Sequence, residues 1–303
     1  IMTKPLISIV MNCYNSDRFL KEAIDSIYAQ TYTNWEIIFW DNASTDDSSD
    51  IAQKYDGRLK YYHVTKTTEI GEARNLALSK AQGDYLAFLD CDDLWMPNKL
   101  NLQVAALEDN LDYKFCYGGV HYIDENEKKL RDTIPIAKSG FTIKQQLDSF
   151  EIGIQSVLIR NDIDISFDTS LEFSPDYDLL MLLACEYKAI VLKEYLIKYR
   201  QSSDSLTNKK IKRWWIETKI TLDRVFLKYP ELKVSYPNQY KKAYAKVHYF
   251  RAMYYFSVED NKKAIDALSK YRFLNFSFLF LYIVSFFGVN VWNLIHKIRN
   301  KLQ

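Results

Sequence analysis

Two aspartates separated by one residue, Asp90 and Asp92, are the side chains in this sequence best placed to bind a metal ion. In an extended backbone, residues two apart point to the same side, so both carboxylates would face one ligand while Cys91 faces the opposite side. Two like charges this close raise each other's pKa unless a cation neutralises them, and hard oxygen ligands suit Mg²⁺ or Mn²⁺ rather than zinc. An alternative is that Asp92 and Asp93 cap the turn into a helix over 98–108.

The aspartates follow the last of four short β-rich segments that alternate with helical patterns. The segments expected as strands are Leu6 to Met11, Glu36 to Trp40, Leu59 to His63 and Tyr85 to Leu89. Such alternation predicts an α/β fold with a parallel sheet, in which ligands bind beyond the carboxyl ends of the strands. Two other strand ends are also polar, at Asn12-Cys13-Tyr14-Asn15 and at Asp41-Asn42. We therefore expect one binding face formed by these three ends.

Four motifs occur in order along this half of the chain. They are Pro5 to Asn15, Trp40 to Asp46, Gly71-Glu72-Ala73-Arg74-Asn75 and Phe88 to Asp93. In this order they resemble the family 2 glycosyltransferases of GT-A fold, over roughly residues 5–207. The resemblance implies a Rossmann-like, mostly parallel central sheet flanked by helices. It also implies inverting, metal-dependent transfer of a hexosyl or N-acetylhexosaminyl group from a nucleotide-sugar donor, with a UDP-sugar expected.

The resemblance also implies roles for individual residues. Asn12, Cys13 and Tyr14 would lie beside the donor base and ribose, and Asp41 would accept a hydrogen bond from the base. Arg74 would lie near the base or diphosphate, Asp90 would face the ribose or metal, and Asp92 would bind the metal. Ordinary structural roles compete with these: an Asx-type turn at Asp41, a surface charge at Arg74 and packing at Tyr14. The sequence departs from the family pattern at Asn12, where Pro or Thr is commoner, and at Asn42-Ala43, where Asp-Gly is frequent.

The catalytic base that the resemblance implies is Asp176, within Ser174-Pro175-Asp176-Tyr177-Asp178. A base must accept the proton of the acceptor hydroxyl as its oxygen attacks the anomeric carbon. Pro175 stands where the family usually has an acid, and Asp178 is an alternative base. Asp176 would also stabilise the start of a helix. Downstream, Tyr199-Arg200 resembles the family's closing loop, so Arg200 would neutralise leaving-group charge, unless its role is structural.

Beyond residue 207 the pattern is helical. We expect the catalytic domain to cover 1–207, and a helical extension to cover 208–272 with an αα-hairpin of Tyr240 to Ser257 and Asp260 to Phe273. Aromatic residues between Trp214 and Tyr255 look exposed, so they would serve a homo-oligomer, an acceptor or a membrane equally well. Residues 273–303 form the remaining segment, in which Phe273 to His296 carries no charged residue and both flanks are basic. This pattern favours a helix that lies in the membrane surface or is re-entrant, with spanning and packing on protein as alternatives.

Composition limits the other functions. The 40 basic and 39 acidic residues nearly balance, which disfavours nucleic acid as a partner. The four cysteines show no paired spacing and no signal-peptide pattern precedes the first strand, so we expect reduced thiols and a cytoplasmic location at the inner face of the cell membrane. A glycan or lipid-linked acceptor in bacterial cell-surface polysaccharide synthesis fits this location. A catalytically inactive nucleotide-sugar-binding relative remains the alternative.

Overall fold

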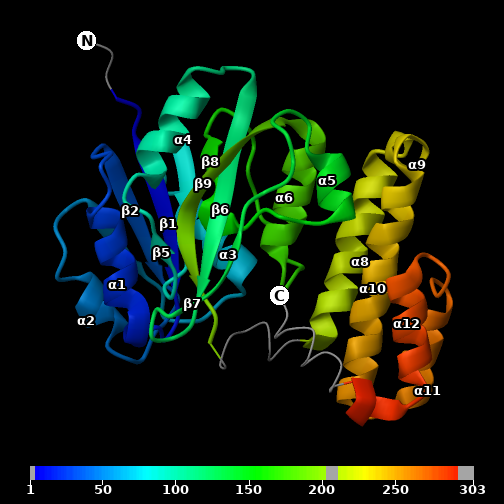
Figure 1. The fold of residues 1–303 in the computed structure, drawn as a ribbon. Coiled ribbons are helices and arrows are strands. Elements are labelled where there is room, and N and C mark those ends of the chain that lie inside the picture. Colours follow the sequence, from blue (N-terminus) through cyan, green and yellow to red (C-terminus); the bar gives the residue numbers. More distant parts are fainter. Residues whose placement is uncertain (1–3, 203–210, 293–303) are drawn as a thin grey trace. The chain divides into compact units, whose positions relative to one another are not determined.

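The computed structural model describes residues 4–202 and 211–292. The chain divides into two compact units, residues 1–146 with 150–202 and residues 147–149 with 203–303. In chain order the elements of the first part are β1 (Ile7–Cys13), α1 (Asp17–Tyr28), β2 (Trp35–Asp41), α2 (Ser48–Ala52), β3 (Leu59–His63), α3 (Ile70–Leu78), β4 (Tyr85–Phe88), β5 (Leu94–Trp95), α4 (Lys99–Glu108), β6 (Tyr113–Ile123), β7 (Lys129–Thr133), α5 (Ile143–Asp148), the 3₁₀ helix η1 (Ile154–Ser156), β8 (Leu158–Arg160), α6 (Pro175–Glu186) and β9 (Lys188–Arg200). The C-terminal helices are α8 (Ile211–Lys228), α9 (Glu231–Ser235), α10 (Pro237–Ser257), α11 (Asn261–Ser269) and α12 (Phe276–Ser285) (Figure 1).

The described strands form one sheet in the order β3-β2-β1-β4-β8-β6-β9-β5, with β7 paired to β6. The four strands expected from the sequence are present, and β1 pairs in parallel with both β2 and β4. Parallel pairing continues from β2 to β3 and recurs between β6 and β9, whereas β8 is antiparallel to its neighbours. The sheet is mostly parallel in the N-terminal half that carries the motifs, as the sequence predicts.

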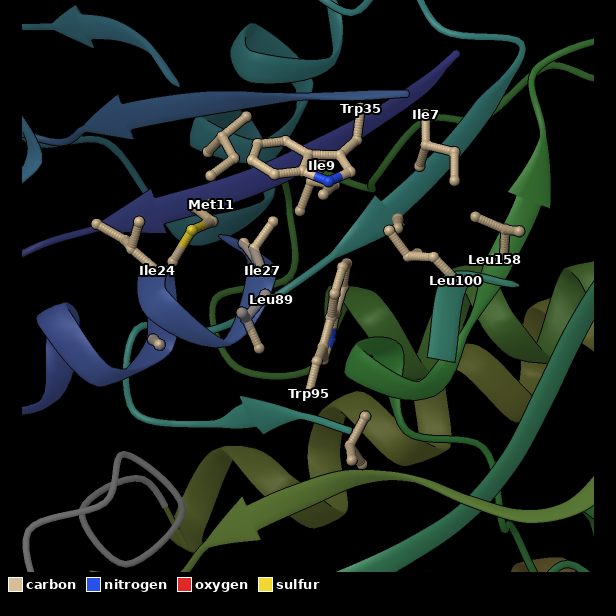
Figure 2. Packing of buried hydrophobic residues seen from close by; sticks show 14 of the residues in the cluster. Ile7, Ile9, Met11, Ile24, Ile27, Trp35, Leu89, Trp95, Leu100 and Leu158 are labelled. Atoms are coloured by element: carbon tan, nitrogen blue, oxygen red, sulfur yellow. The ribbon is translucent and has the colours of Figure 1, made fainter. Parts of the chain in front are cut away.

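Each face of the sheet is buried by helices because side chains alternate along the strands. Ile7, Ile9 and Met11 of β1 enter one core cluster with residues of α1 and α4. Figure 2 shows this cluster, with Ile24 and Ile27 of α1 and the rings of Trp35 and Trp95. On the other face, Val10 packs with apolar residues of α3 and α6. The long strand β1 is therefore fixed on both sides, and its carboxyl end is held in place.

The run from Ile152 to Ile159 is strand-like in sequence, but a strand over this whole run is wrong. Its first half forms η1 and only its second half continues into β8, which spans Leu158–Arg160. The polar residues Ser44 to Asp47 predict a capped helix that runs to about Tyr55, whereas α2 covers only Ser48–Ala52. Both differences lie at the binding edge of the sheet, where side-chain hydrogen bonds, described below, hold non-repetitive backbone.

The C-terminal unit contains the αα-hairpin expected from the sequence, formed by α10 and α11. The aromatic residues expected to be exposed between Trp214 and Tyr255 instead pack against one another. Trp214 of α8 stacks on Phe250 of α10 at a centroid distance of 4.5 Å, and Phe226 meets Tyr240 edge to face at 4.7 Å. These rings are buried or half-buried, so they do not offer the exposed aromatic surface that the sequence suggested.

The apolar segment from Phe273 does not form one long helix in its described part. α12 ends at Ser285, after which a turn and the left-handed backbone of Gly288, with φ of +80°, interrupt it. Within residues 4–202 and 211–292, every helix is too short or too polar to cross a membrane. Residues 293–296 of the predicted segment lie outside the described residues. The boundaries predicted at 207 and 272 stay predictions, although α12 packs in one cluster with α10 and α11.

Candidate active site

Three strand ends meet at one edge of the sheet because of their register. Cys13 of β1 is paired with Asp41 of β2, and Val10 is paired with Phe88 of β4, two residues before Asp90. Cys91 donates to the Asn12 carbonyl oxygen at 3.3 Å, which ties the loop after β4 to the end of β1. The three polar motifs therefore come together as the sequence predicts.

Asp90 and Asp92 lie in a turn after β4 rather than in the extended backbone that the sequence suggested, and the Asp93 N–H donates to the Asp90 carbonyl oxygen at 3.3 Å. Both carboxylates are half-buried, whereas Cys91 is buried in the core cluster beneath the sheet. Burial, together with the negative charge of Asp90, raises the pKa of Asp92 to about 6. Burial first, and then Asp92 and Asp90, raises the pKa of Asp93 well above its usual range. The loop thus carries more negative charge than its own surroundings neutralise.

The carboxylates of Asp90 and Asp92 suit a hard divalent cation, provided that the substrate supplies further oxygen ligands. Among residues 4–202 and 211–292, no three His, Cys, Asp or Glu side chains group to hold a metal on their own. Asp92, with Asp90 beside it, offers carboxylate oxygens of the type that Mg²⁺ and Mn²⁺ prefer. Mg²⁺ in particular is commonly held by one or two carboxylates plus substrate phosphates, so the arrangement suits binding of a cation together with a diphosphate.

Arg74 is a buried partner of Asp90, which excludes a surface role. It is 4% exposed, and its guanidinium lies 3.1 Å from Asp90 Oδ1. Helix α3 is held close to α6, because a Cβ on Gly71 would meet the Asp168 carbonyl oxygen at 3.0 Å and Pro175 Cβ at 3.4 Å. Asn75 fixes the same region by exchanging two 2.8 Å hydrogen bonds with the backbone of Phe167. The Gly-Glu-Ala-Arg-Asn motif therefore brings Arg74 to the Asp90 carboxylate and joins α3 to the segment that leads into Asp176.

Asp176 lies in the first turn of α6, where the charges of Arg74 and Asp90 act on its carboxyl. Burial raises the pKa of its carboxyl, Arg74 lowers it, and the charge of Asp90 raises it further. Pro175 occupies the first helical turn, where its missing N–H costs no helix hydrogen bond, so the loss of the family's acid leaves the helix start intact. Asp176 is half-buried, whereas the alternative base Asp178 is 3% exposed. Of the two, Asp176 is the more accessible to an acceptor.

Asp41 has the structural role that the alternative interpretation proposed. It is fully buried, accepts from the Ser44 N–H at 2.8 Å and from the Tyr61 hydroxyl at 2.6 Å, and so closes the turn after β2. Although burial opposes ionisation, these hydrogen bonds lower its pKa below the usual range. Ala43 in this turn has φ of +67°, which costs an L-residue about 1 kcal/mol and explains why glycine is frequent there. Contact of Asp41 with a donor base stays a prediction.

The residues after β1 differ in their exposure. Cys13 is buried against Cys91, which leaves its backbone rather than its thiol to meet a donor. Tyr14 is 55% exposed, so its ring is not a core residue and is free for stacking. Both side-chain polar atoms of Asn12 are buried without a hydrogen-bond partner in the described protein. Unsatisfied buried polar atoms are costly, which indicates that Asn12 binds a ligand or water.

Arg200 reaches the site but contacts protein rather than open space. Its guanidinium donates to the Asp92 carbonyl oxygen at 2.9 Å and to Glu22 at 2.7 Å, and its backbone N–H donates to Asp93 Oδ1 at 2.7 Å. With its side chain 1% exposed, it anchors the Asp92 loop. Its predicted contact with the leaving group stays a prediction.

Gln155 is a site residue that none of the sequence motifs indicates. Its side-chain amide donates to Asp90 Oδ2 at 2.6 Å, so Arg74 and Gln155 together hold both oxygens of Asp90. The available signal was a polar pair, Gln155-Ser156, inside an apolar run assigned to a strand.

Three buried side chains hold the backbone that presents Gln155. Trp95 donates to the Gln155 carbonyl oxygen at 3.1 Å, Gln103 to that of Ser156 at 2.8 Å and Lys99 to that of Val157 at 3.2 Å. Burial without an acidic partner lowers the pKa of Lys99 to about 7. Three successive carbonyls are thus satisfied from β5 and α4, which gives Gln155 a fixed position.

Substituting Gln155 is expected to weaken donor use by misplacing Asp90. In Gln155→Ala, loss of a hydrogen bond to a charged group should lower kcat/KM for the donor about 10- to 100-fold. Steady-state kinetics with varied donor concentration measure this effect, and Gln53→Ala, which removes an exposed side-chain amide just after α2, is the matched control. Unchanged kcat/KM in a folded Gln155→Ala protein would contradict the positioning role.

Comparison with known proteins gives the family of the chain. Residues 8–164 match the family model for glycosyl transferase family 2. An uncharacterized glycosyltransferase of Methanocaldococcus jannaschii is 33% identical over 208 residues, covering 66% of this chain and 72% of the relative. The UDP-Glc:alpha-D-GlcNAc-diphosphoundecaprenol beta-1,3-glucosyltransferase of Escherichia coli is 30% identical, covering 69% of this chain and 84% of the relative.

A solved structure shares the fold. The mannosyltransferase of Pyrobaculum calidifontis, in complex with GDP-Man and Mn²⁺, superposes with a TM-score of 0.58 over 89% of this chain and 76% of its own, at 16% identity. This likeness agrees with the GT-A architecture expected from the motifs. From the family match and the extent of the relatives' similarity, the chain belongs to glycosyl transferase family 2.

Proposed function

We propose that this glycosyltransferase moves a sugar from a UDP-sugar to a hydroxyl of a glycan or lipid-linked acceptor, with inversion at the anomeric carbon. The observation that carries the proposal is the grouping of Asp90, Asp92, Arg74 and Asp176 beyond the carboxyl ends of β1, β2 and β4. The uridine nucleotide and the lipid-linked acceptor are supported by the activity for which the Escherichia coli relative is named. Bacterial cell-surface polysaccharide synthesis at the inner face of the cell membrane fits such an acceptor.

The proposed reaction divides the work among these residues. The half-buried Asp176 accepts the proton of the acceptor hydroxyl as its oxygen bonds to the anomeric carbon and the bond to the diphosphate breaks. Asp92, with Asp90 beside it, would hold a Mn²⁺ or Mg²⁺ ion, which supplies positive charge to the departing diphosphate. Arg74 and Gln155 fix Asp90. Asn12 and Tyr14 would contact the base and ribose of the donor.

The proposal predicts stabilisation by nucleoside diphosphate only in the presence of metal. At saturating UDP, about 100 times its dissociation constant, binding adds roughly 2.7 kcal/mol to the free energy of unfolding, which corresponds to a rise in Tm of about 5–10 °C. Thermal unfolding should show this rise in Mn²⁺ and lose it in EDTA. GDP is a necessary comparison, because the Pyrobaculum calidifontis structure contains GDP-Man. No response to any nucleoside diphosphate in Mn²⁺ or Mg²⁺ would refute the donor site.

The inactive-relative alternative rests on Pro175, which replaces the family's first acid. It predicts the same nucleotide stabilisation without turnover. Release of nucleoside diphosphate from a panel of nucleotide sugars, measured with metal and a large amount of enzyme, separates the two. Metal-dependent release supports the transferase.

A further inference from the structure

The C-terminal unit has an exposed apolar face on α12 and the turns beside it. Within α12, Phe276, Phe280 and Ile283 recur at spacings of four and three residues, which places them on one side of the helix. The exposed large apolar residues of this region are Phe273, Phe276, Phe280, Ile283, Phe286 and Phe287. Three of these rings are more than two-thirds exposed, at 76% for Phe273, 82% for Phe276 and 68% for Phe287. We refer to these six residues as the phenylalanine face.

The other side of α12 is buried within its own unit. Leu281 and Val284 pack in one cluster with Ala252 and Phe256 of α10 and with Trp292. Figure 1 shows α12 beside α10 and α11, with which it shares this cluster. One side of the helix therefore packs within the unit, and the phenylalanine face takes no part in that packing. An aromatic patch of this kind marks an interaction site.

The charges that flank the phenylalanine face along the sequence are of one sign. After Asp266 the sequence has no acidic residue, whereas Lys270 and Arg272 precede the face and Lys297, Arg299 and Lys301 follow it. Arg272 lies over the Phe273 ring at 4.7 Å, so one positive charge is in direct contact with the face. Juxtamembrane basic residues each gain about 1 kcal/mol near an anionic lipid surface. This complementarity favours an anionic partner with an apolar interior.

We propose that the phenylalanine face docks the enzyme onto the anionic surface of a phospholipid membrane, with α12 lying in the plane of the interface. A short helix with aromatic residues on one side and basic flanks is typical of interfacial binding, and α12 is too short to cross a bilayer. A second copy of the chain is a poorer occupant, because a symmetric contact would bring the two sets of basic flanks together. The inference deepens the proposed function by naming the surface that places the enzyme where a lipid-linked acceptor lies.

Vesicle co-sedimentation of the full chain tests the docking surface. We expect binding to phosphatidylcholine vesicles containing about one-third phosphatidylglycerol, and much weaker binding to phosphatidylcholine alone or in high salt. The combined substitution Phe276→Ser, Phe280→Ser and Phe287→Ser should lower the partition coefficient on anionic vesicles more than about 100-fold, because each ring inserted in lipid contributes about tenfold or more. Lys297→Gln, Arg299→Gln and Lys301→Gln together should reduce binding to the anionic vesicles only.

The matched control replaces three exposed apolar residues elsewhere, Leu111→Ser, Ile136→Ser and Leu227→Ser, and should bind as the unaltered chain does. All variants should keep the UDP-dependent rise in Tm, so a failure of membrane docking is distinguishable from a failure of the donor site. Absence of vesicle binding, or equal binding by the triple phenylalanine variant, would overturn the proposal. So would a dimer that the same variant converts to a monomer without any vesicle binding.

Discussion

Asp176→Asn is expected to lower kcat about 1000-fold while leaving nucleotide binding within about a factor of three. A positioned general base contributes 10²- to 10⁴-fold, and asparagine keeps the size of the side chain but cannot accept the proton. Since α6 begins at Pro175 and Ser174 makes no side-chain capping bond to the helix, the amide should preserve the helix start. Initial rates with saturating donor and acceptor, and titration of UDP in Mn²⁺, measure the two effects separately.

The pH dependence of the activity gives a second test of Asp176 as the catalytic base. Burial raises the pKa of Asp176, so the base is protonated, and inactive, up to a higher pH than an ordinary carboxyl. Activity of the unaltered enzyme should therefore fall as pH decreases through this raised pKa, and the residual activity of Asp176→Asn should lack that limb. Asp164→Asn, which neutralises an exposed acid, is the control for charge alone. Full activity of Asp176→Asn would move the base role to Asp178.

Asp92→Asn is expected to abolish the Mn²⁺-dependent part of donor binding. Loss of one of two carboxylates at a diphosphate-metal site should weaken UDP binding in Mn²⁺ by on the order of 100-fold or more, because the cation loses charge neutralisation as well as a ligand. Calorimetric titration of UDP in Mn²⁺ and in EDTA gives the two affinities. Under EDTA the variant and the unaltered chain should bind equally weakly.

The stability of the ligand-free protein distinguishes this role from a turn cap. Loss of a cap costs about 1 kcal/mol of the free energy of unfolding. Burial and the Asp90 charge instead raise the pKa of Asp92 to about 6, so at pH 7.5 the carboxyl is mainly ionised and its charge destabilises the folded state relative to the unfolded chain. Asp92→Asn should then be at least as stable as the unaltered chain in urea unfolding. A clear loss of stability with intact Mn²⁺-dependent binding would assign Asp92 to the turn.

The strands and the binding edge were predictable because their signals are local. Alternating burial along β1 sends Ile7, Ile9 and Met11 to one face and Val10 to the other, and this period is readable in the sequence. Polar residues directly after each buried run mark where the parallel strands end. The helical pattern beyond residue 207 likewise predicted the hairpin of α10 and α11.

What the sequence could not predict depends on contacts between distant segments. Gln155 reaches Asp90 only because side chains from β5 and α4 hold its backbone in a 3₁₀ turn, whereas local propensity favours a strand. The burial of Arg200 depends on Glu22 and Asp92, more than a hundred residues earlier in the chain. The interruption of the apolar segment at Gly288 depends on a backbone conformation that composition does not determine.

The contacts of Arg200 have a consequence for biosynthesis. Its side chain joins Glu22 of α1, the Asp92 loop and the Glu125 carbonyl oxygen, and its backbone satisfies Asp93. During translation, β1, β2 and β4 leave the ribosome long before this residue does. The nascent chain therefore carries the Asp90–Asp93 loop without its anchor, and the donor site is complete only once residue 200 has emerged and β9 has paired with β6 and β5.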